Sequence, residues 1–433
     1  MIPSDPITLV LSIILCLFFV LFFIERKKIA YNFPPGPRPL PIIGNLHILD
    51  MKKPYITMHQ LSKKYGPVYT LQLGVEKVVV ICGYEAVKDA LVNHADEFSG
   101  RAKVALLEEM YKGHGILFAS NDNWRAMRRF TLSSLRDFGM GKEAIENKIS
   151  EEADFLVQKF RSYKGEPFDN TMTINAAACN IIVSILLSKR FDYEDPTLLK
   201  LIKMNNEVTK LIATPMAMEK PNPKLYFTNE NLTALVSDLF DAGMETTSTT
   251  LRWGLLLMMK HPEIQKKVQN EIDKVIGSNE PQVIHRKDMP YTDAVIHEIQ
   301  RFGNIVPSSI SHATTQDVNF RGYLLPKGIQ VIPLLTSVLY DKDHFVKADE
   351  FYPEHFLDSS GNFVRKEAFM PFSAGKRSCA GENLAKMELY MFFTRLLQNF
   401  TFKAPPGATL DLNPEVGFIR YPMPYKTCAI PRL

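Results

Sequence analysis

Apolar residues recur at helical spacing along much of the chain. Between residues 141 and 161 the apolar positions follow one another every three or four residues, as on one face of a helix: Ile145, Ile149, Ala153, Leu156 and Phe160. Similar patterns predict an unusually long helix over 229–260 and shorter helices over 262–276 and 290–302. The chain is therefore expected to be mainly α-helical.

A smaller part of the chain has the alternation of β-strands. Residues 67–81 alternate around Gly74 and predict a β-hairpin, and a helix is expected over the following residues 84–92. A second hairpin is expected over 320–335, around the turn at 325–328. Residues 214–231 contain three prolines and show no period, which indicates a linker. The fold class is thus mainly α with a minor β-sheet region.

The N-terminal segment has a different character. Residues 7–24 contain no charge, and a helix of this length reaches about 27 Å, just enough to cross a bilayer. A cleaved signal peptide is the alternative, but the apolar run exceeds the usual length of about 7–15 residues and no basic segment precedes it. Because Arg26, Lys27 and Lys28 follow the run, the positive-inside rule places the body in the cytosol. Residues 1–28 are expected to be one transmembrane signal-anchor.

A proline-rich segment connects this anchor to the rest of the chain. Five prolines lie between Pro34 and Pro41, and they favour a stiff, extended backbone. Such segments can also be ligands of SH3-type domains, but the position next to an anchor favours a spacer. Residues 29–45 are expected to form a hinge that orients the body against the membrane.

Composition excludes several classes of protein. The length of 433 residues gives a soft prior of about three domains. The excess of 51 Lys and Arg over 47 Asp and Glu is too small for a general nucleic-acid binder. The cysteines are odd in number, far apart and without a Cys-x-x-Cys pair, so neither a disulfide framework nor a cysteine zinc site is encoded: Cys16, Cys82, Cys179, Cys379 and Cys428.

Cys379 is the cysteine with the most informative surroundings. It lies in FSAGKRSCAGE, where a loop enters a predicted apolar helix, so the helix N-terminus and Arg377 are expected to favour a thiolate near neutral pH. The glycines Gly375 and Gly381 allow a flat, bulky group to approach the backbone. A nucleophile would need a base nearby, and the segment offers none, so metal ligation is favoured.

This segment resembles the haem-binding signature of the cytochrome P450 superfamily, Phe-x-x-Gly-x-Arg-x-Cys-x-Gly, from Phe372 to Gly381. The resemblance implies the cytochrome P450 fold, a single catalytic domain over 46–433, and haem b as cofactor. It also implies that Cys379 is the axial thiolate ligand of the haem iron. The chain is most similar to the second, microsomal family of the superfamily.

The long predicted helix contains a polar segment at residues 242–250. A glycine and several hydroxyl residues interrupt an otherwise apolar helix there, and such side chains can bond to backbone carbonyls and bend it. A solvated face is the alternative, but the apolar run that follows favours a central helix. The segment resembles the family's oxygen-activation helix, which implies that Glu245 and Thr246 form the acid–alcohol pair that relays protons.

Glu298 and Arg301 lie three residues apart on one helix face, where an exposed pair would contribute only about 0.2–0.5 kcal/mol. They resemble the family's Glu-x-x-Arg pair, and His355 stands where the family has the third member of a structural network. Further matches to the family imply contacts to the two haem propionates from Arg101, Trp124, Arg128, His312 and Arg377. The evidence is weakest for His312, because a single histidine can have many other roles.

The resemblance also implies partners and a location. Arg125, Arg129 and Lys376 would suit docking of an acidic electron donor, although a charge cluster is usually a solvated face. The donor would be the membrane-bound NADPH-dependent flavoprotein reductase, with cytochrome b5 as a second one. NADPH would act only through this partner, since the chain has no Gly-x-Gly-x-x-Gly fingerprint. The expected location is the endoplasmic reticulum membrane, with the catalytic domain facing the cytosol.

Length is the departure from the family pattern. The resemblance implies that about sixty residues are absent near 214–231, which is beyond ordinary loop variation, and that the absent part would roof the substrate cavity. The expected function is that of a monooxygenase acting on lipophilic substrates such as fatty acids, steroids or xenobiotics. Residues 305–310 and 417–419 are expected to line the substrate cavity. The alternatives are a haem-binding protein without turnover, and peroxide-driven or isomerising chemistry, against which the intact Glu245–Thr246 pair argues.

Overall fold

Helices make up most of the molecule, as the apolar periodicity predicts. The computed structural model describes residues 10, 12–13, 32–102, 111–139, 143–212, 228–415 and 417–432. The helices are α2 (Pro54–Tyr65), α3 (Tyr84–Lys88), α5 (Asn121–Asp137), α6 (Glu143–Ser162), α7 (Thr171–Leu187), α8 (Pro196–Ile212), α9 (Asn229–Lys260), α10 (Pro262–Val275), α11 (Pro290–Gly303), α12 (Thr336–Leu339) and α13 (Glu382–Asn399). The mainly α class with minor sheets is confirmed.

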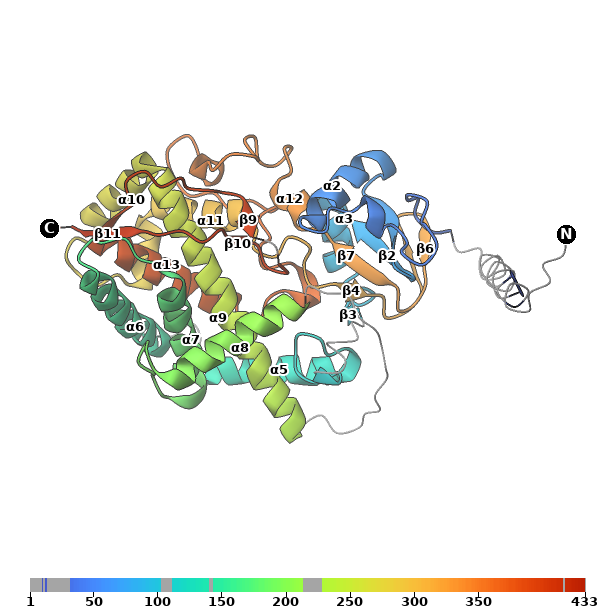
Figure 1. The fold of residues 1–433 in the computed structure, drawn as a ribbon, viewed down its shortest axis with the longest axis horizontal. Coiled ribbons are helices and arrows are strands. Elements are labelled where there is room, and N and C mark those ends of the chain that lie inside the picture. The colour runs from blue at the N-terminus through green and yellow to red at the C-terminus, as the bar shows by residue number, and fades with distance from the viewer. Residues whose placement is uncertain are drawn as a thin grey trace.

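The main sheet lies at one end of the molecule beside α2 and α3, away from the helices α6, α10 and α13 (Figure 1). Its strand order is β1–β2–β7–β4–β3, with β2 and β7 parallel and the other neighbours antiparallel. The strands are β1 (Val68–Leu73), β2 (Glu76–Ile81), β3 (Gly100–Arg101), β4 (His312–Ala313) and β7 (Gln330–Pro333). The described residues also form three two-stranded sheets: β5 (Val318–Phe320) with β6 (Tyr323–Leu325), β8 (Phe400–Lys403) with β11 (Cys428–Pro431), and β9 (Pro414–Glu415) with β10 (Tyr421–Pro422).

One of the two predicted hairpins is confirmed and the other is wrong. Strands β1 and β2 pair as predicted over 67–81. The hairpin predicted over 320–335 does not form, because β6 pairs with β5 and β7 pairs with β2 and β4. Arg321 and Gly322 both have positive φ, of 50° and 85°, and form the two-residue turn that suits the twist of a hairpin. This tighter turn closes the hairpin before the chain reaches residues 325–328.

Helix α9 runs through the middle of the molecule (Figure 1). It starts where Thr228 caps it, its side chain accepting a hydrogen bond of 3.2 Å from the backbone N–H of Asn231. It ends before Pro262, which begins α10. Its second half is buried on every side in the largest apolar core, where Trp253 and Leu255 have no exposed surface. The predictions over 229–260, 262–276 and 290–302 are confirmed.

The proline-rich segment is extended but fixed to the body. The backbone N–H and the hydroxyl of Thr70 on β1 donate hydrogen bonds of 2.8 and 2.9 Å to the carbonyls of Pro35 and Pro34. The predicted anchor and the predicted linker fall almost wholly outside the described residues; the last three linker residues belong to α9. Across the described ranges, no helix has both the length and the apolar character needed to cross a bilayer.

Candidate active site

A cavity of about 250 Å³ lies between helix α9 and the loop that enters α13. Cys379 lines it from this loop, and Thr246 lines it from the polar segment of α9. The remaining walls are largely apolar and come from α7, α9 and the residues after α11: Ile182, Ile185, Leu186, Leu239, Ile305, Val306 and Ile310. The cavity therefore combines a thiol, a hydroxyl and a hydrophobic enclosure.

The loop around Cys379 is held by backbone contacts. The N–H of Cys379 donates a hydrogen bond of 3.0 Å to the carbonyl of Phe372, and Gly375 has a φ of 68°. The thiol opens into the cavity, but burial among protein atoms raises its pKa, an effect that a backbone hydrogen bond from Gly381 only partly offsets. In the protein by itself, burial therefore opposes the expected thiolate, which stays a prediction for the iron-bound cysteine.

Three arginines surround the cavity without a carboxylate partner. Arg101, Arg128 and Arg377 line it, and none of them forms an ion pair with another described residue. Burial lowers the pKa of Arg377 to about 7 and that of Arg101 to about 9, and repulsion between the guanidinium groups adds to both shifts. Such a cluster is electrostatically incomplete and favours an anionic ligand.

Trp124 and His312 support the arginine cluster in different ways. Trp124, on α5, lines the cavity, and the guanidinium carbon of Arg377 lies 3.8 Å from the centre of its ring. His312 pairs with Arg101 across β3 and β4 and is buried, its Nδ1 lying 2.7 Å from the carbonyl of Phe98. Burial and the neighbouring Arg101 hold the pKa of His312 well below its usual value. Neither His312 nor Gly375 is among the residues that line the cavity.

The predicted acid–alcohol pair is divided between two surroundings. The hydroxyl of Thr246 lines the cavity and donates a hydrogen bond of 2.7 Å to the carbonyl of Ala242, one turn earlier on α9. Glu245 is buried but does not line the cavity. Its Oε2 accepts a hydrogen bond of 3.4 Å from Nδ2 of Asn205, on α8. The structure therefore directs the carboxylate towards α8 and the hydroxyl towards the cavity.

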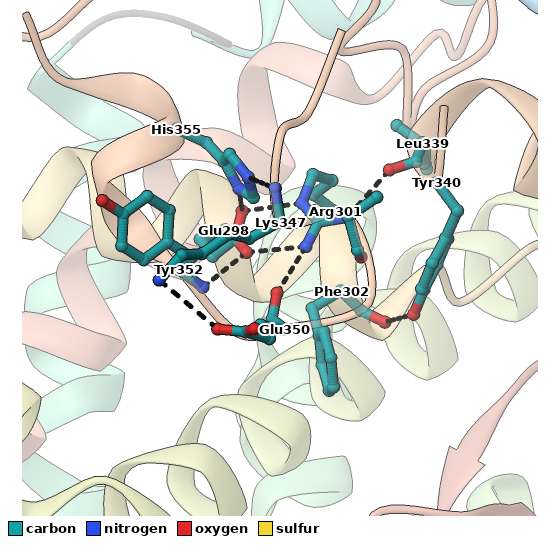
Figure 2. Close-up of polar contacts among 10 residues, drawn as sticks. Glu298, Arg301, Phe302, Leu339, Tyr340, Lys347, Glu350, Tyr352 and His355 are labelled. Carbon is teal, nitrogen blue, oxygen red and sulfur yellow. Dashed lines mark hydrogen bonds and ion pairs between the residues drawn. The ribbon is translucent and has the colours of Figure 1, made fainter. Parts of the chain in front are cut away.

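Glu298, Arg301 and His355 come together in a buried network (Figure 2). The Arg301 guanidinium donates two hydrogen bonds of 2.7 Å to the Glu298 carboxylate, and neither side chain has exposed surface. Nδ1 of His355 lies 3.2 Å from the same carboxylate. Arg301 also donates to three carbonyls of a later segment: Leu339, Ala348 and Glu350. The network joins α11 to residues 339–355.

Comparisons with known proteins identify the family. The sequence profile of the cytochrome P450 family matches residues 34–221 and 211–429. Cytochrome P450 2K1 of Oncorhynchus mykiss is 45% identical, with 92% of each chain covered. Cytochrome P450 2G1 of Oryctolagus cuniculus is 42% identical, covering 96% of this chain and 98% of the relative. Cytochrome P450 2C8 of Homo sapiens is 42% identical, covering 97% and 99%. The chain belongs to the cytochrome P450 family.

Cytochromes P450 are haem-containing monooxygenases, so this chain is an oxidoreductase that incorporates oxygen, and its cofactor is haem b. Its relatives named above all carry the family number 2. The alignment to the Oncorhynchus protein runs over 465 positions, more than the 433 residues of this chain, so the relative has residues without a counterpart here. The two matched stretches meet at residues 211–221.

The residues of this cytochrome P450 fit a haem group. A thiol that opens into the cavity suits an iron ligand, and the three arginines without a carboxylate suit the two propionates of a haem. The fit to a haem therefore rests on two features of the protein: the thiol and guanidinium groups that face the cavity, and the positive charge of the arginines, which no carboxylate among the described residues balances. We infer that Cys379 would hold the iron, and that Arg101, Arg128 and Arg377 would hold the propionates.

Two buried carboxyl groups of the cavity escaped the sequence analysis. Asp238 on α9 accepts hydrogen bonds of 2.6 and 3.0 Å from the backbone N–H groups of Ile116 and Leu117, and burial raises its pKa to about 7. Glu388 on α13 also lines the cavity. Each acid stands beside apolar residues of a helix that the sequence predicts to be buried, which was the signal available in the sequence.

Proposed function

We propose that this cytochrome P450 is a membrane-anchored haem-thiolate monooxygenase that inserts one atom of O2 into a lipophilic substrate. The observation that carries this proposal is the convergence of the Cys379 thiol and three unpaired arginines on one mostly apolar cavity. When bound, the haem supplies the reductive activation of dioxygen.

The side chains around the cavity have separable roles in this proposal. Cys379 would hold the iron from the loop that Phe372 and Gly375 shape, while Trp124 and the arginines would bind the propionates of the cofactor. Thr246 offers a hydroxyl that can exchange its hydrogen bond to Ala242 for one to a group in the cavity. Glu245 is the acid that reprotonates this hydroxyl once its carboxylate has turned from Asn205 and taken up a proton from water.

The substrate class follows from the cavity walls. Isoleucine, leucine and valine side chains from α7, α9 and the segment after α11 exclude water, and a lipophilic molecule is the ligand that such walls bind best. Of the two stretches expected to line the site, residues 305–310 contribute Ile305, Val306 and Ile310, whereas residues 417–419 are not among the lining residues. Fatty acids, steroids and xenobiotics remain the proposed substrates.

The proposed electron donor is the NADPH-dependent flavoprotein reductase of the endoplasmic reticulum, with cytochrome b5 as a second donor. Arg125, Arg129 and Lys376 are exposed on α5 and on the loop before Cys379. Arg125 and Lys376 form ion pairs with Asp96, a carboxylate that an acidic donor could replace. The expected residues 1–28 would anchor the protein beside this membrane-bound partner.

The absence of about sixty residues near 214–231 remains part of the proposal. Two observations support it. The alignment to the Oncorhynchus relative is longer than the chain, and the family profile matches in two separate stretches, of which the second begins at residue 211. The absent segment would cover the cavity, and its loss would admit water and release reduced oxygen as peroxide.

The ferrous carbonyl spectrum of the expressed full chain tests the proposal first. A red-shifted Soret band is expected, and its absence would overturn thiolate ligation by Cys379. NADPH consumption and product formation with added reductase then test turnover on a panel of lipophilic compounds. Haem binding without any product would instead support the alternative of a catalytically impaired variant.

A further inference from the structure

Helix α13 carries a glutamate that none of the roles above uses. Glu388 lies nine residues after Cys379 and lines the same cavity, although only 1% of its surface is exposed. Its helix neighbours Met387 and Leu389 are buried and apolar. One carboxyl oxygen, Oε1, has no hydrogen-bond partner within the described part of the chain. An unpartnered buried oxygen is costly unless a group or a water in the cavity bonds to it.

The polar neighbour of Glu388 comes from the long helix. The hydroxyl of Thr247, which lines the cavity beside Thr246, makes a side-chain hydrogen bond with the Glu388 carboxyl. No charged group among the described residues acts appreciably on this carboxyl, from α13 itself or from α9. Burial raises the pKa of Glu388 to about 8, and the bond to Thr247 only partly opposes this rise. Burial therefore favours the neutral form of this side chain near pH 7.

The two acids near the consecutive threonines of α9 thus have different surroundings. Glu245 is bonded to Asn205 on α8 and does not line the cavity, whereas Glu388 lines the cavity and bonds to Thr247. The position of Glu388 is the more direct one for a group that must exchange a proton with the interior of the cavity. Its neutral form is also the form that can donate.

We propose that Glu388 is a second acid of this enzyme, which holds a proton on the cavity side of Thr247 and replenishes the hydroxyl groups of α9. The carboxyl passes its proton to Oγ1 of Thr247 while this hydroxyl passes its own proton to a water molecule in the cavity. The resulting Glu388 carboxylate then takes up a proton from water. The inference rests on the proposed monooxygenase function and adds a proton source that the family resemblance did not supply.

Infrared spectroscopy of the holoenzyme tests the proton directly. The carbonyl stretch of a protonated carboxyl should disappear with a midpoint near pH 8, and Glu388→Gln should lack this band while Glu245→Gln keeps it. Asp238→Asn serves as a control, because it removes the other cavity acid, which titrates near pH 7. Thr247→Val should move the midpoint upward, since the Thr247 hydrogen bond lowers the Glu388 pKa.

Turnover gives the second measurement. Product formed per NADPH consumed should fall above about pH 8 in the parent enzyme, because Glu388 loses its proton there. At pH 7, Glu388→Gln should reduce product formation about a hundredfold, the lower end of the range for acid–base catalysis, and should lack the alkaline limb. Glu245→Gln should retain that limb.

The two levels of the proposal fail differently. A parent enzyme without the red-shifted ferrous carbonyl band would overturn the haem-thiolate function itself. If the band is present in the parent and in Glu388→Gln, but the infrared signal or the alkaline limb persists in this variant, only the role of Glu388 is wrong. If the Glu388→Gln protein fails to bind haem, the Thr247→Val variant is the deciding test. An unchanged pH midpoint of the infrared band in Thr247→Val would contradict the proposal.

Discussion

Two independent constraints require glycine at position 375. Its φ of 68° lies in the left-handed region, where glycine is favoured. In addition, a Cβ at this position would overlap the backbone carbonyl of Leu91, which cannot move aside as a flexible side chain could. The sequence motif indicates a glycine here, but only the packing of the cysteine loop against η2 (Asp89–Asn93) explains it.

Gly375→Ala is therefore expected to displace the loop of Cys379 and to prevent haem incorporation. Gly361→Ala is the matched control, since Gly361 also has a positive φ, of 82°, but a Cβ there would meet no atom within 4 Å. The control should lose only about 1–2 kcal/mol for the left-handed backbone. Absorbance of bound haem per protein chain measures the difference, and equal loading of the two variants would contradict the argument.

Individual site residues differ in how well the sequence predicts them. Cys379 and Arg377 belong to a motif of fixed spacing, so the order of residues along the chain is enough to assign them to one site. Asp238 and Glu388 lie beside apolar residues of their helices, and their partners are backbone N–H groups or a hydroxyl from distant parts of the chain. No spacing rule connects such partners, so their meeting depends on tertiary packing.

The acid Asp238 also makes stability depend on pH. Its pKa is raised by burial from an ordinary value near 4 to about 7, so the folded protein binds this proton more tightly than the unfolded chain. The contribution to stability is complete below about pH 4 and is lost as the pH rises to about 7. Asp238→Asn should reduce the decrease in the free energy of unfolding between about pH 4 and pH 7, measured by urea titration at several pH values. An unchanged pH dependence would contradict the raised pKa.

At the scale of elements, buried charge joins α11 to the segment over 339–355. Glu298→Gln would leave the Arg301 guanidinium without its anionic partner in a place with no exposed surface. The expected loss is about 3–5 kcal/mol in the free energy of unfolding, measured by urea titration. Lys342→Gln is the control, because its ion pair with Asp349 is largely exposed, and its unfolding midpoint should stay near the parent value. A loss as small as that of the control would contradict the network's structural role.

Element boundaries could be predicted where local chemistry sets them. Thr228 caps α9, and prolines begin α10 and α11, so the three predicted ranges differ from the structure by at most one residue. The failed hairpin over 320–335 has the opposite cause. Arg321 and Gly322 form a tighter turn, and the partner that β7 takes instead, β2, lies far away in the sequence. Local patterns carry no information on such a partner.

At the scale of the whole molecule, the missing roof is the main expectation left to test. A chimera that receives the corresponding segment of the Oncorhynchus relative at residues 213–227 should release less peroxide per NADPH consumed than the parent chain. The reason is that a covered cavity excludes water and retains the substrate. A flexible Gly/Ser insert of equal length is the control. If both inserts change the peroxide ratio equally, coverage by a specific roof is not the cause.

The parallel pairing of β2 with β7 also has a consequence for folding during synthesis on the ribosome. Val79 pairs with Val331, so one edge of the early hairpin has no partner until the distant strand has been made. At about 5–20 residues per second, synthesis of the roughly 250 intervening residues takes roughly 12–50 s. During this time a strand with four buried apolar positions offers its hydrogen-bonding edge to any other chain nearby. Nascent chains of this enzyme should therefore depend on chaperones most strongly before residue 333 has emerged.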